Sequence, residues 1–324
     1  MSNAIETLPP LAQSVLEKGP GLTELYHRYN NVVMSLVSNG HIRPDDLVGK
    51  RILDWECGAG VYALLFVERG AAHVDAIDSW LWTEECQKTM GHIPQIKFGK
   101  ISLEDYASDR SRHGTYDFVF ANTVTEHMLN LPKQLPIVGR LLKPGGLFVT
   151  NHDNYYQPVG SHDHGFLYYG ADNKIQRQGP ACWEKAEKCE ASKTHRLDVM
   201  KKLPWTWDAS MEKKLTPHDC TQCPYFKRSQ PWGHLRHQAE FKEVYPQPCF
   251  TTGYHHSSLN KITQFQLRQW VIEAGLDIQA WIQNRINNEV PDVLLAPPFN
   301  FRADDLTTAT ITVVARKSFS PYGE

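Results

Sequence analysis

The sequence has no long apolar run, no basic leader and almost no net charge, and each absence excludes a class of protein. No hydrophobic stretch in the 324 residues approaches the roughly 20 that span a membrane, which excludes an integral membrane protein. The first residues, Met1-Ser2-Asn3-Ala4, lack the basic and apolar regions of a secretory signal, so we expect a cytoplasmic protein. With 34 Lys and Arg against 36 Asp and Glu, the chain lacks the basic surplus of a general nucleic-acid binder.

The composition that remains is that of a globular protein. Hydrophobic residues make up 41% of the chain and charged residues 22%, which is enough for a sizeable core and excludes a disordered chain. At about 150 residues per domain, the length suggests two domains or one enlarged domain. We expect a monomer or homodimer whose partner is a small-molecule substrate. Neither a nucleic acid nor a membrane is expected as a partner.

Short apolar runs alternate with helical stretches from Lys50 onward. Five runs with strand character precede residue 151, at 51–55, 73–78, 95–99, 116–120 and 146–150. Two more, at 276–282 and 308–315, follow a helical stretch at 263–275, and residues 1–48 have helical spacing. Strands joined by helices are typical of a parallel sheet built from right-handed crossovers. The pattern predicts an α/β fold with seven strands and helices on both faces.

The clearest motif is the run D-W-E-C-G-A-G, from Asp54 to Gly60, between a strand and a helix. Its glycines allow a ligand to approach the backbone closely, and the next helix directs free N–H groups at the same place. Position 63 is Ala, so the run is not the dinucleotide fingerprint, although another nucleotide-binding Rossmann protein stays an alternative. The carboxylates of Asp54 and Glu56 suit a ligand with a positive charge. Asp78, at the end of the second strand, can accept both hydroxyls of a ribose.

Three further runs complete a resemblance. They are N-T-V-T-E-H at 122–127, L-L-K-P-G-G at 141–146 and W-V-I-E-A-G-L at 270–276. Together with the loop, they resemble the class I S-adenosylmethionine-dependent methyltransferase family over roughly residues 45–151 and 258–316. The resemblance implies a seven-stranded Rossmann-like methyltransferase sheet with N-terminal helices and a large insertion after the fifth strand.

The resemblance also implies S-adenosylmethionine as cofactor and a set of residues that bind it. Gly58, Gly60 and Asn122 would approach the methionine part, and Asp78 would bind the ribose. The adenine would lie among residues that follow the second and third strands. The full cofactor set is Glu56, Gly58, Gly60, Asp78, Ser79, Trp80, Ile101, Ser102 and Asn122. Glu56 stands where the family more often has glycine.

The segment 152–262 interrupts the alternation and holds nine of the 15 histidines and five of the seven cysteines. We expect it to form a substrate-binding lid, inserted into a cofactor domain made of 49–151 and 263–324, with 1–48 as a helical segment. The predicted catalytic residues are His127, Asn154 and Tyr155, because imidazole, amide and phenol groups orient an acceptor or take its proton. For each, a packing role is the alternative.

Metal binding is the weaker interpretation of the lid, and we expect no metal. His162-Asp163-His164 could bind one, and Cys220 and Cys223 could form a zinc site with Cys182 or Cys189. However, a second C-x-x-C pair is absent from the sequence. Core thiols and a polar turn fit these residues better.

The leading functional hypothesis is methyl transfer from S-adenosylmethionine to a small polar metabolite by in-line displacement. An alternative enzyme would cyclise the cofactor, releasing methylthioadenosine and a four-membered imino acid of the azetidine-2-carboxylate type. A remote alternative is a non-catalytic cofactor-binding protein. The acceptor atom is open, but N-T-V-T at 122–125 is not the N/D-P-P-Y motif of nucleobase and glutamine-amide methyltransferases.

Overall fold

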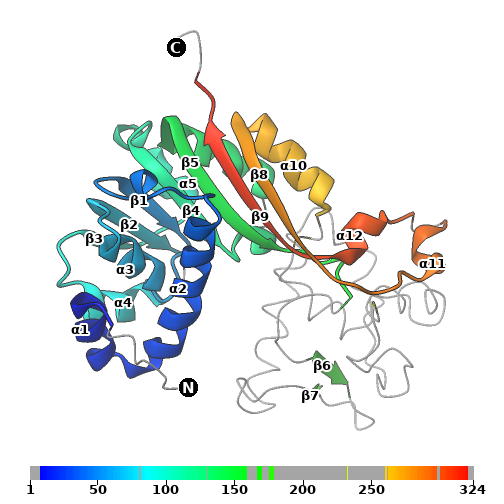
Figure 1. Cartoon of the computed structure of the whole chain (residues 1–324), viewed down its shortest axis with the longest axis horizontal. Coiled ribbons are helices and arrows are strands. Elements are labelled where there is room, and N and C mark those ends of the chain that lie inside the picture. Colours follow the sequence, from blue (N-terminus) through cyan, green and yellow to red (C-terminus); the bar gives the residue numbers. More distant parts are fainter. Residues whose placement is uncertain are drawn as a thin grey trace.

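One mixed sheet forms the centre of the computed structural model, which describes residues 8–79, 82–128, 130–158, 166–169, 175–178, 232, 260, 262–297 and 300–319. The sheet's strands are β1 (Arg51–Trp55), β2 (His73–Asp78), β3 (Ile96–Lys100), β4 (Tyr116–Asn122), β5 (Leu142–Asp153), β8 (Leu276–Arg285) and β9 (Thr308–Lys317). Their order is β3-β2-β1-β4-β5-β9-β8 (Figure 1). The first three strands therefore extend the sheet from β1 toward one edge, and the later strands extend it from β4 toward the other. The predicted seven-stranded α/β fold is confirmed.

The sheet is not entirely parallel, and the expectation of a parallel sheet was wrong for its last strand. The pairs β1–β2, β1–β4, β2–β3 and β4–β5 are parallel, whereas β9 is antiparallel to both β5 and β8. Among the described residues between β8 and β9, no helix carries the chain back to the end at which β8 begins. The strand β9 therefore starts near the end of β8 and runs antiparallel to it. The cofactor half is unaffected, because all of its strands are parallel.

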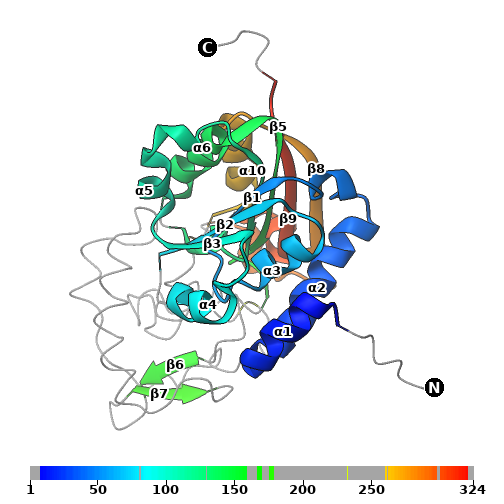
Figure 2. The ribbon, with the colours of Figure 1, turned by 90° about the vertical axis from the view of Figure 1, so that its left-hand side faces the viewer.

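Helices cover both faces of the sheet (Figure 2). The longer ones are α1 (Pro10–Lys18), α2 (Thr23–Ser38), α3 (Val61–Glu68), α4 (Trp82–Met90), α5 (Leu103–Ser108), α6 (Leu131–Leu141) and α10 (Gln264–Glu273). Helices α1 to α4 share one hydrophobic cluster with the sheet, and α5, α6 and α10 share the other. Alternate residues of β4 serve the two clusters, with Phe118 and Phe120 in the first and Val119 and Ala121 in the second.

A glycine and a proline shape two local features of the backbone. Gly145, within the bounds of β5, has a φ of 74° at the point where the β4–β5 register shifts. Pro10 begins α1. A proline is tolerated in the first turn because its missing N–H would have no intrahelical acceptor.

The chain after β5 contributes a small third cluster beside the sheet. Tyr155 and Trp232 are buried there against Leu294 and Leu306, which belong to the short helices α11 (Asp292–Leu295) and α12 (Ala303–Thr307). A two-stranded hairpin, β6 (Phe166–Tyr169) with β7 (Ile175–Gln178), also falls within the predicted insertion. Among the described residues, no helix is long and apolar enough to cross a membrane.

Candidate functional site

The loop that joins β1 to α3 is built from residues in the left-handed backbone region. Glu56, Gly58 and Gly60 have φ values of 55°, 52° and 70°. A Cβ atom at Gly60 would lie 2.7 Å from the ring of Phe98, so only glycine fits there. A Cβ at Gly58 would meet no atom of the described residues within 4 Å. The loop therefore packs tightly against the protein at Gly60 and borders open space at Gly58.

Asp78 and Ser79, at the end of β2, hold this loop in place. The backbone N–H of Gly58 donates to Oδ2 of Asp78 at 2.8 Å. The Ser79 hydroxyl and backbone N–H donate to the carboxylate of Glu56, at 3.1 Å and 3.3 Å to Oε2. Ile101 joins the group because its N–H donates to the Asp78 carbonyl at 3.0 Å. Four of the predicted cofactor residues besides the loop glycines thus meet at one edge of the sheet.

Negative charge is concentrated at this edge. Burial, and after it the charge of Asp78, raises the pKa of Glu56 to about 7. The same two causes raise the pKa of Asp54, which is 2% exposed, to about 8. Oδ2 of Asp54 is buried with no hydrogen-bond partner in the described part of the chain. A cationic ligand beside the loop would stabilise the ionised form of both carboxylates.

The remaining predicted cofactor residues are more dispersed. Asn122 ends β4, and its Nδ2 donates to Thr123 at 3.2 Å while its Oδ1 is buried without a hydrogen-bond partner among the described residues. Ser102 caps α5, accepting from the Asp105 N–H at 3.1 Å and donating to its carboxylate at 2.8 Å. A cap of this kind is a structural role. Trp80 lies outside the described residues.

A second polar group occupies the ends of β4 and β5. The turn η4 (Thr125–His127) places Glu126 in the interior at 1% exposure, with Nε2 of His127 3.9 Å from its Oε1. Burial, and after it the charge of Asp153, raises the pKa of Glu126 well above its ordinary value. The His127 side chain is 33% exposed, so it lies beside a buried carboxyl group and still reaches the surface.

His152 and Asn260 fix this turn from two sides. Nδ1 of His152 lies 3.0 Å from Oγ1 of Thr125, and burial lowers the pKa of His152 to about 4. Asn260 donates its backbone N–H to the Glu126 carbonyl at 2.8 Å and its Nδ2 to the Thr125 carbonyl at 2.6 Å. The sequence does not predict that His152 and Asn260 support His127. Its only signal is the presence of asparagine and histidine residues near positions 152 and 260.

Asn154 and Tyr155, two of the three predicted catalytic residues, lie in the interior. Nδ2 of Asn154 donates to the carbonyls of Asp305 and Thr308 at 2.5 Å and 2.7 Å, and its Oδ1 accepts from the Tyr156 N–H. Tyr155 is 3% exposed and packs in the third cluster. Asn154 uses both amide hydrogens within the protein, which favours a structural role.

Metal ligands do not gather in the part of the chain that the structure covers. Among those residues, no group of three or more His, Cys, Asp or Glu could hold an ion. The seven residues weighed as metal ligands in the sequence all fall outside that part: His162, Asp163, His164, Cys182, Cys189, Cys220 and Cys223. Cys57 and Cys86 are buried beside the loop, and the Cys86 thiol donates to the Gly58 carbonyl at 3.2 Å.

Two relatives are similar in sequence to part of this chain. The human mitochondrial "Ubiquinone biosynthesis O-methyltransferase" is 30% identical over 144 residues, which is 43% of this chain and 38% of the relative. Its counterpart from Neisseria meningitidis is 31% identical over 105 residues, 32% of this chain and 43% of the relative. The matched segments thus span less than half the length of either relative.

Among solved structures, an S-adenosylmethionine-dependent methyltransferase from Mesorhizobium loti is similar to this chain at 12% identity, with a TM-score of 0.45 over 86% of this chain and 94% of the other. The family model described as "Methyltransferase domain" matches residues 27–280, which is most of the chain. The chain therefore belongs to the methyltransferase domain family, in agreement with the S-adenosylmethionine-dependent methyltransferases that its motifs resemble.

Proposed function

We propose that the protein transfers a methyl group from S-adenosylmethionine to a small polar acceptor at the carboxyl edge of the sheet. The observation that carries the proposal is the cluster of Asp54, Glu56 and Asp78 around a loop that borders open space at Gly58. The cofactor's sulfonium supplies an electrophilic methyl group, and its sulfonium and ammonium charges are complementary to three carboxylates. The residues present therefore fit the cofactor.

The roles proposed for the loop residues follow from their contacts. Asp78 already accepts the Gly58 N–H. An ionised carboxylate has about four lone-pair positions, so Asp78 can still accept ribose hydroxyls. Glu56, fixed by Ser79, adds a second acceptor beside the same hydroxyls. Asn122, with its unsatisfied Oδ1, is the candidate donor and acceptor for the amino acid part.

His127 is the group proposed to take the acceptor's proton. Of the two histidines at the β4 and β5 ends, His152 is buried and its low pKa keeps it neutral. His127 is partly exposed and adjacent to Glu126. An imidazolium that forms there would lower the raised pKa of Glu126, and the carboxylate would in turn stabilise the imidazolium. Asn260 and Thr125 would act as positioning residues for it. Residues 152–262 would complete the acceptor site as a lid that excludes water.

Oxygen is the acceptor atom to test first. The relatives named above are O-methyltransferases of ubiquinone biosynthesis, and a phenol or hydroxyl acceptor needs a base such as His127 to remove its proton as attack proceeds. Aligning the acceptor oxygen with the methyl carbon would supply several kcal/mol through proximity, in the range of about 7–11 kcal/mol for well-oriented reactants.

One incubation tests the proposal. The purified protein is mixed with S-adenosylmethionine, with and without a panel of hydroxylated metabolites, and the products are identified by mass spectrometry. S-adenosylhomocysteine that forms only with an acceptor supports methyl transfer. Methylthioadenosine formed without an acceptor would replace the proposal with cyclisation, and cofactor binding without any turnover would replace it with a binding protein.

A further inference from the structure

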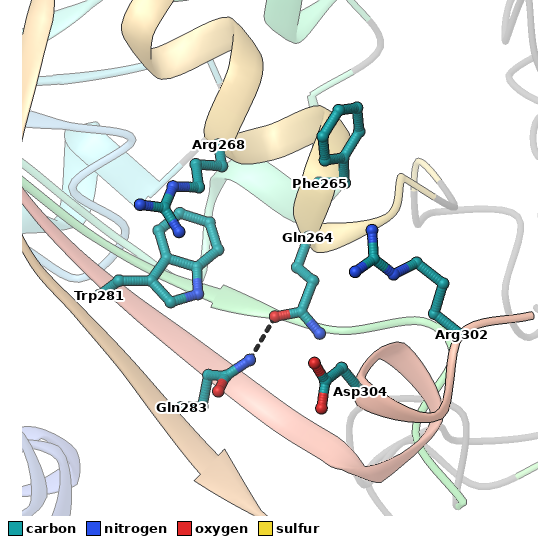
Figure 3. A pocket seen from close by; sticks show the side chains of 7 residues that line it. All are labelled: Gln264, Phe265, Arg268, Trp281, Gln283, Arg302 and Asp304. Atoms are coloured by element: carbon teal, nitrogen blue, oxygen red, sulfur yellow. Dashed lines mark hydrogen bonds between the residues drawn. The ribbon is translucent and has the colours of Figure 1, made fainter.

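A separate cavity of about 240 Å³ opens between α10, β8 and α12 (Figure 3). The strand β8 forms one edge of the sheet, away from the cofactor loop after β1. The cavity is lined by Gln264, Phe265, Arg268, Trp281, Gln283, Arg302 and Asp304. Four strand positions separate β8 from β1 in the sheet order. At about 4.8 Å per strand, that is about 19 Å, so the cavity does not belong to the cofactor loop.

The charges that line the cavity favour an anion. Its one carboxylate, Asp304, is neutralised by Arg285 at 3.0 Å. In the described part of the chain, neither Arg268 nor Arg302 forms an ion pair, although the charge of Arg302 opposes the rise that burial causes in the pKa of Asp305. Two guanidinium groups and one paired carboxylate leave the lining of the cavity net positive. The whole chain has a formal charge of −2, which makes this positive site a local feature.

The polar groups between the two arginines add a hydrogen-bond donor. Gln264 accepts a hydrogen bond from Nε2 of Gln283. Its carbonyl oxygen is thereby engaged, and its amide nitrogen turns away from Gln283 toward the side of the cavity formed by Arg302 and Asp304 (Figure 3). An amide N–H beside a guanidinium is a donor pair that matches the two oxygens of a carboxylate.

The apolar part of the lining favours an aromatic body on the ligand. The Arg268 guanidinium lies over the Trp281 ring, 5.9 Å from its centroid, and Phe265 exposes 59% of its surface at the rim. Trp281 and Phe265 therefore give the cavity two aromatic side chains against which the ring of a ligand can pack. Drug-sized ligands occupy pockets of about 300–1,000 Å³, so this cavity suits a smaller molecule.

We propose that this cavity binds a small aromatic carboxylate, with the carboxylate on Arg302, Gln264 and Arg268 and the ring against Trp281 and Phe265. A carboxylate is favoured over a phosphate, because the neighbouring amide and guanidinium N–H groups of Gln264 and Arg302 match the two oxygens of a planar carboxylate. The site is independent of the methyl transfer proposed above. It adjoins Asp305 of α12, which accepts the Gln264 N–H at 3.1 Å.

The test is a calorimetric titration of the full chain with benzoate, using phenyl phosphate and neutral benzamide as comparison ligands. We expect saturable benzoate binding, at least about tenfold weaker binding of benzamide, and phenyl phosphate weaker than benzoate. Arg302→Gln and Arg268→Gln should each weaken benzoate binding about tenfold. Arg110→Gln, at an exposed arginine of the 3-10 helix Arg110–Arg112 beside α5, should leave it unchanged.

The result that overturns the proposal is equally defined. Absence of saturable benzoate binding, equal binding of benzamide, or binding that Arg302→Gln and Arg268→Gln leave intact would each contradict it. A preference for phenyl phosphate would reject the carboxylate assignment. Competition by saturating S-adenosylmethionine would place benzoate at the cofactor loop instead. Because the wild-type comparison of benzoate with benzamide needs no variant, a variant that fails to fold leaves the test intact.

Discussion

The two halves of the sheet's carboxyl edge hold their polar side chains in different ways. At the β1–β2 end, the contacts join residues close in sequence, such as Gly58 to Asp78 and Glu56 to Ser79, and the loop borders open space. At the β4–β5 end, buried groups are tied to distant segments, as Asn154 is to Thr308 and Thr125 to Asn260. The proposed cofactor site can thus be built within a short stretch of the sequence, whereas the proposed acceptor site depends on the whole fold.

The largest effect should separate chemistry from cofactor binding. Replacing His127 by Gln should lower kcat by about 10²–10⁴-fold, the usual contribution of a general base, while the Kd for S-adenosylmethionine stays the same. Steady-state kinetics with the acceptor that the incubation identifies, combined with calorimetry, measures both. A variant with unchanged kcat would remove His127 from the mechanism and leave the β4–β5 end with a structural role alone.

The next effect concerns the burial of His152. Its folded-state pKa of about 4 lies below the ordinary value of 6.5, so its contribution to stability is complete above 6.5 and is lost as the pH falls toward 4. His152→Asn keeps an acceptor for Thr125 without a titrating ring. Between about pH 7 and about pH 4.5, the wild type should lose about 2–3 kcal/mol more unfolding free energy than the variant.

Urea unfolding at several pH values measures this difference. Glu126 acts in the opposite direction, because its raised pKa favours the folded state at low pH. Taking the difference between the wild type and His152→Asn removes that contribution, which both proteins share. Parallel curves of stability against pH for the two proteins would show that His152 is not held neutral in the interior.

A smaller effect compares two glycines with the same backbone and different surroundings. Gly58 and Gly114 have φ values of 52° and 62°, and a Cβ at either would meet nothing within 4 Å in the part of the chain that the structure describes. Alanine at each should cost a similar 1–2 kcal/mol, roughly, because L-residues are strained in this region. Only Gly58→Ala should also weaken S-adenosylmethionine binding, by about tenfold. Equal affinities for the two variants would contradict a ligand beside Gly58.

The smallest effect is the pH dependence of cofactor affinity. A bound cation would lower the pKa of Glu56 below its free value of about 7, so binding releases protons and affinity rises with pH through 7 before it levels off. Glu56→Gln should reduce this rise by roughly threefold, while Asp54, with a pKa of about 8, retains part of it. S-adenosylhomocysteine, which lacks the sulfonium charge, should show a weaker dependence. An unchanged slope in Glu56→Gln would refute the role of that carboxylate.

The same contrast explains what the sequence could predict. Strands 51–55 and 73–78 and the loop between them were predictable, because each feature depends on neighbouring residues. The antiparallel direction of β9 was not, since strand direction is decided by where the preceding chain ends. Nor was the interior position of Asn154, because its partners Asp305 and Thr308 lie about 150 residues away in the sequence. Polar type and spacing alone suggested a catalytic residue there.

The most direct measurement is calorimetric titration of S-adenosylmethionine into the wild type, Asp78→Asn and His127→Gln. Losing charge-assisted hydrogen bonds to ribose at about 1.5–3 kcal/mol each should weaken binding to Asp78→Asn by at least about tenfold. The wild type and His127→Gln should bind one equivalent with the same Kd. Equal binding by Asp78→Asn, or no saturable binding by the wild type, would contradict a cofactor site at the β1–β2 end of the sheet.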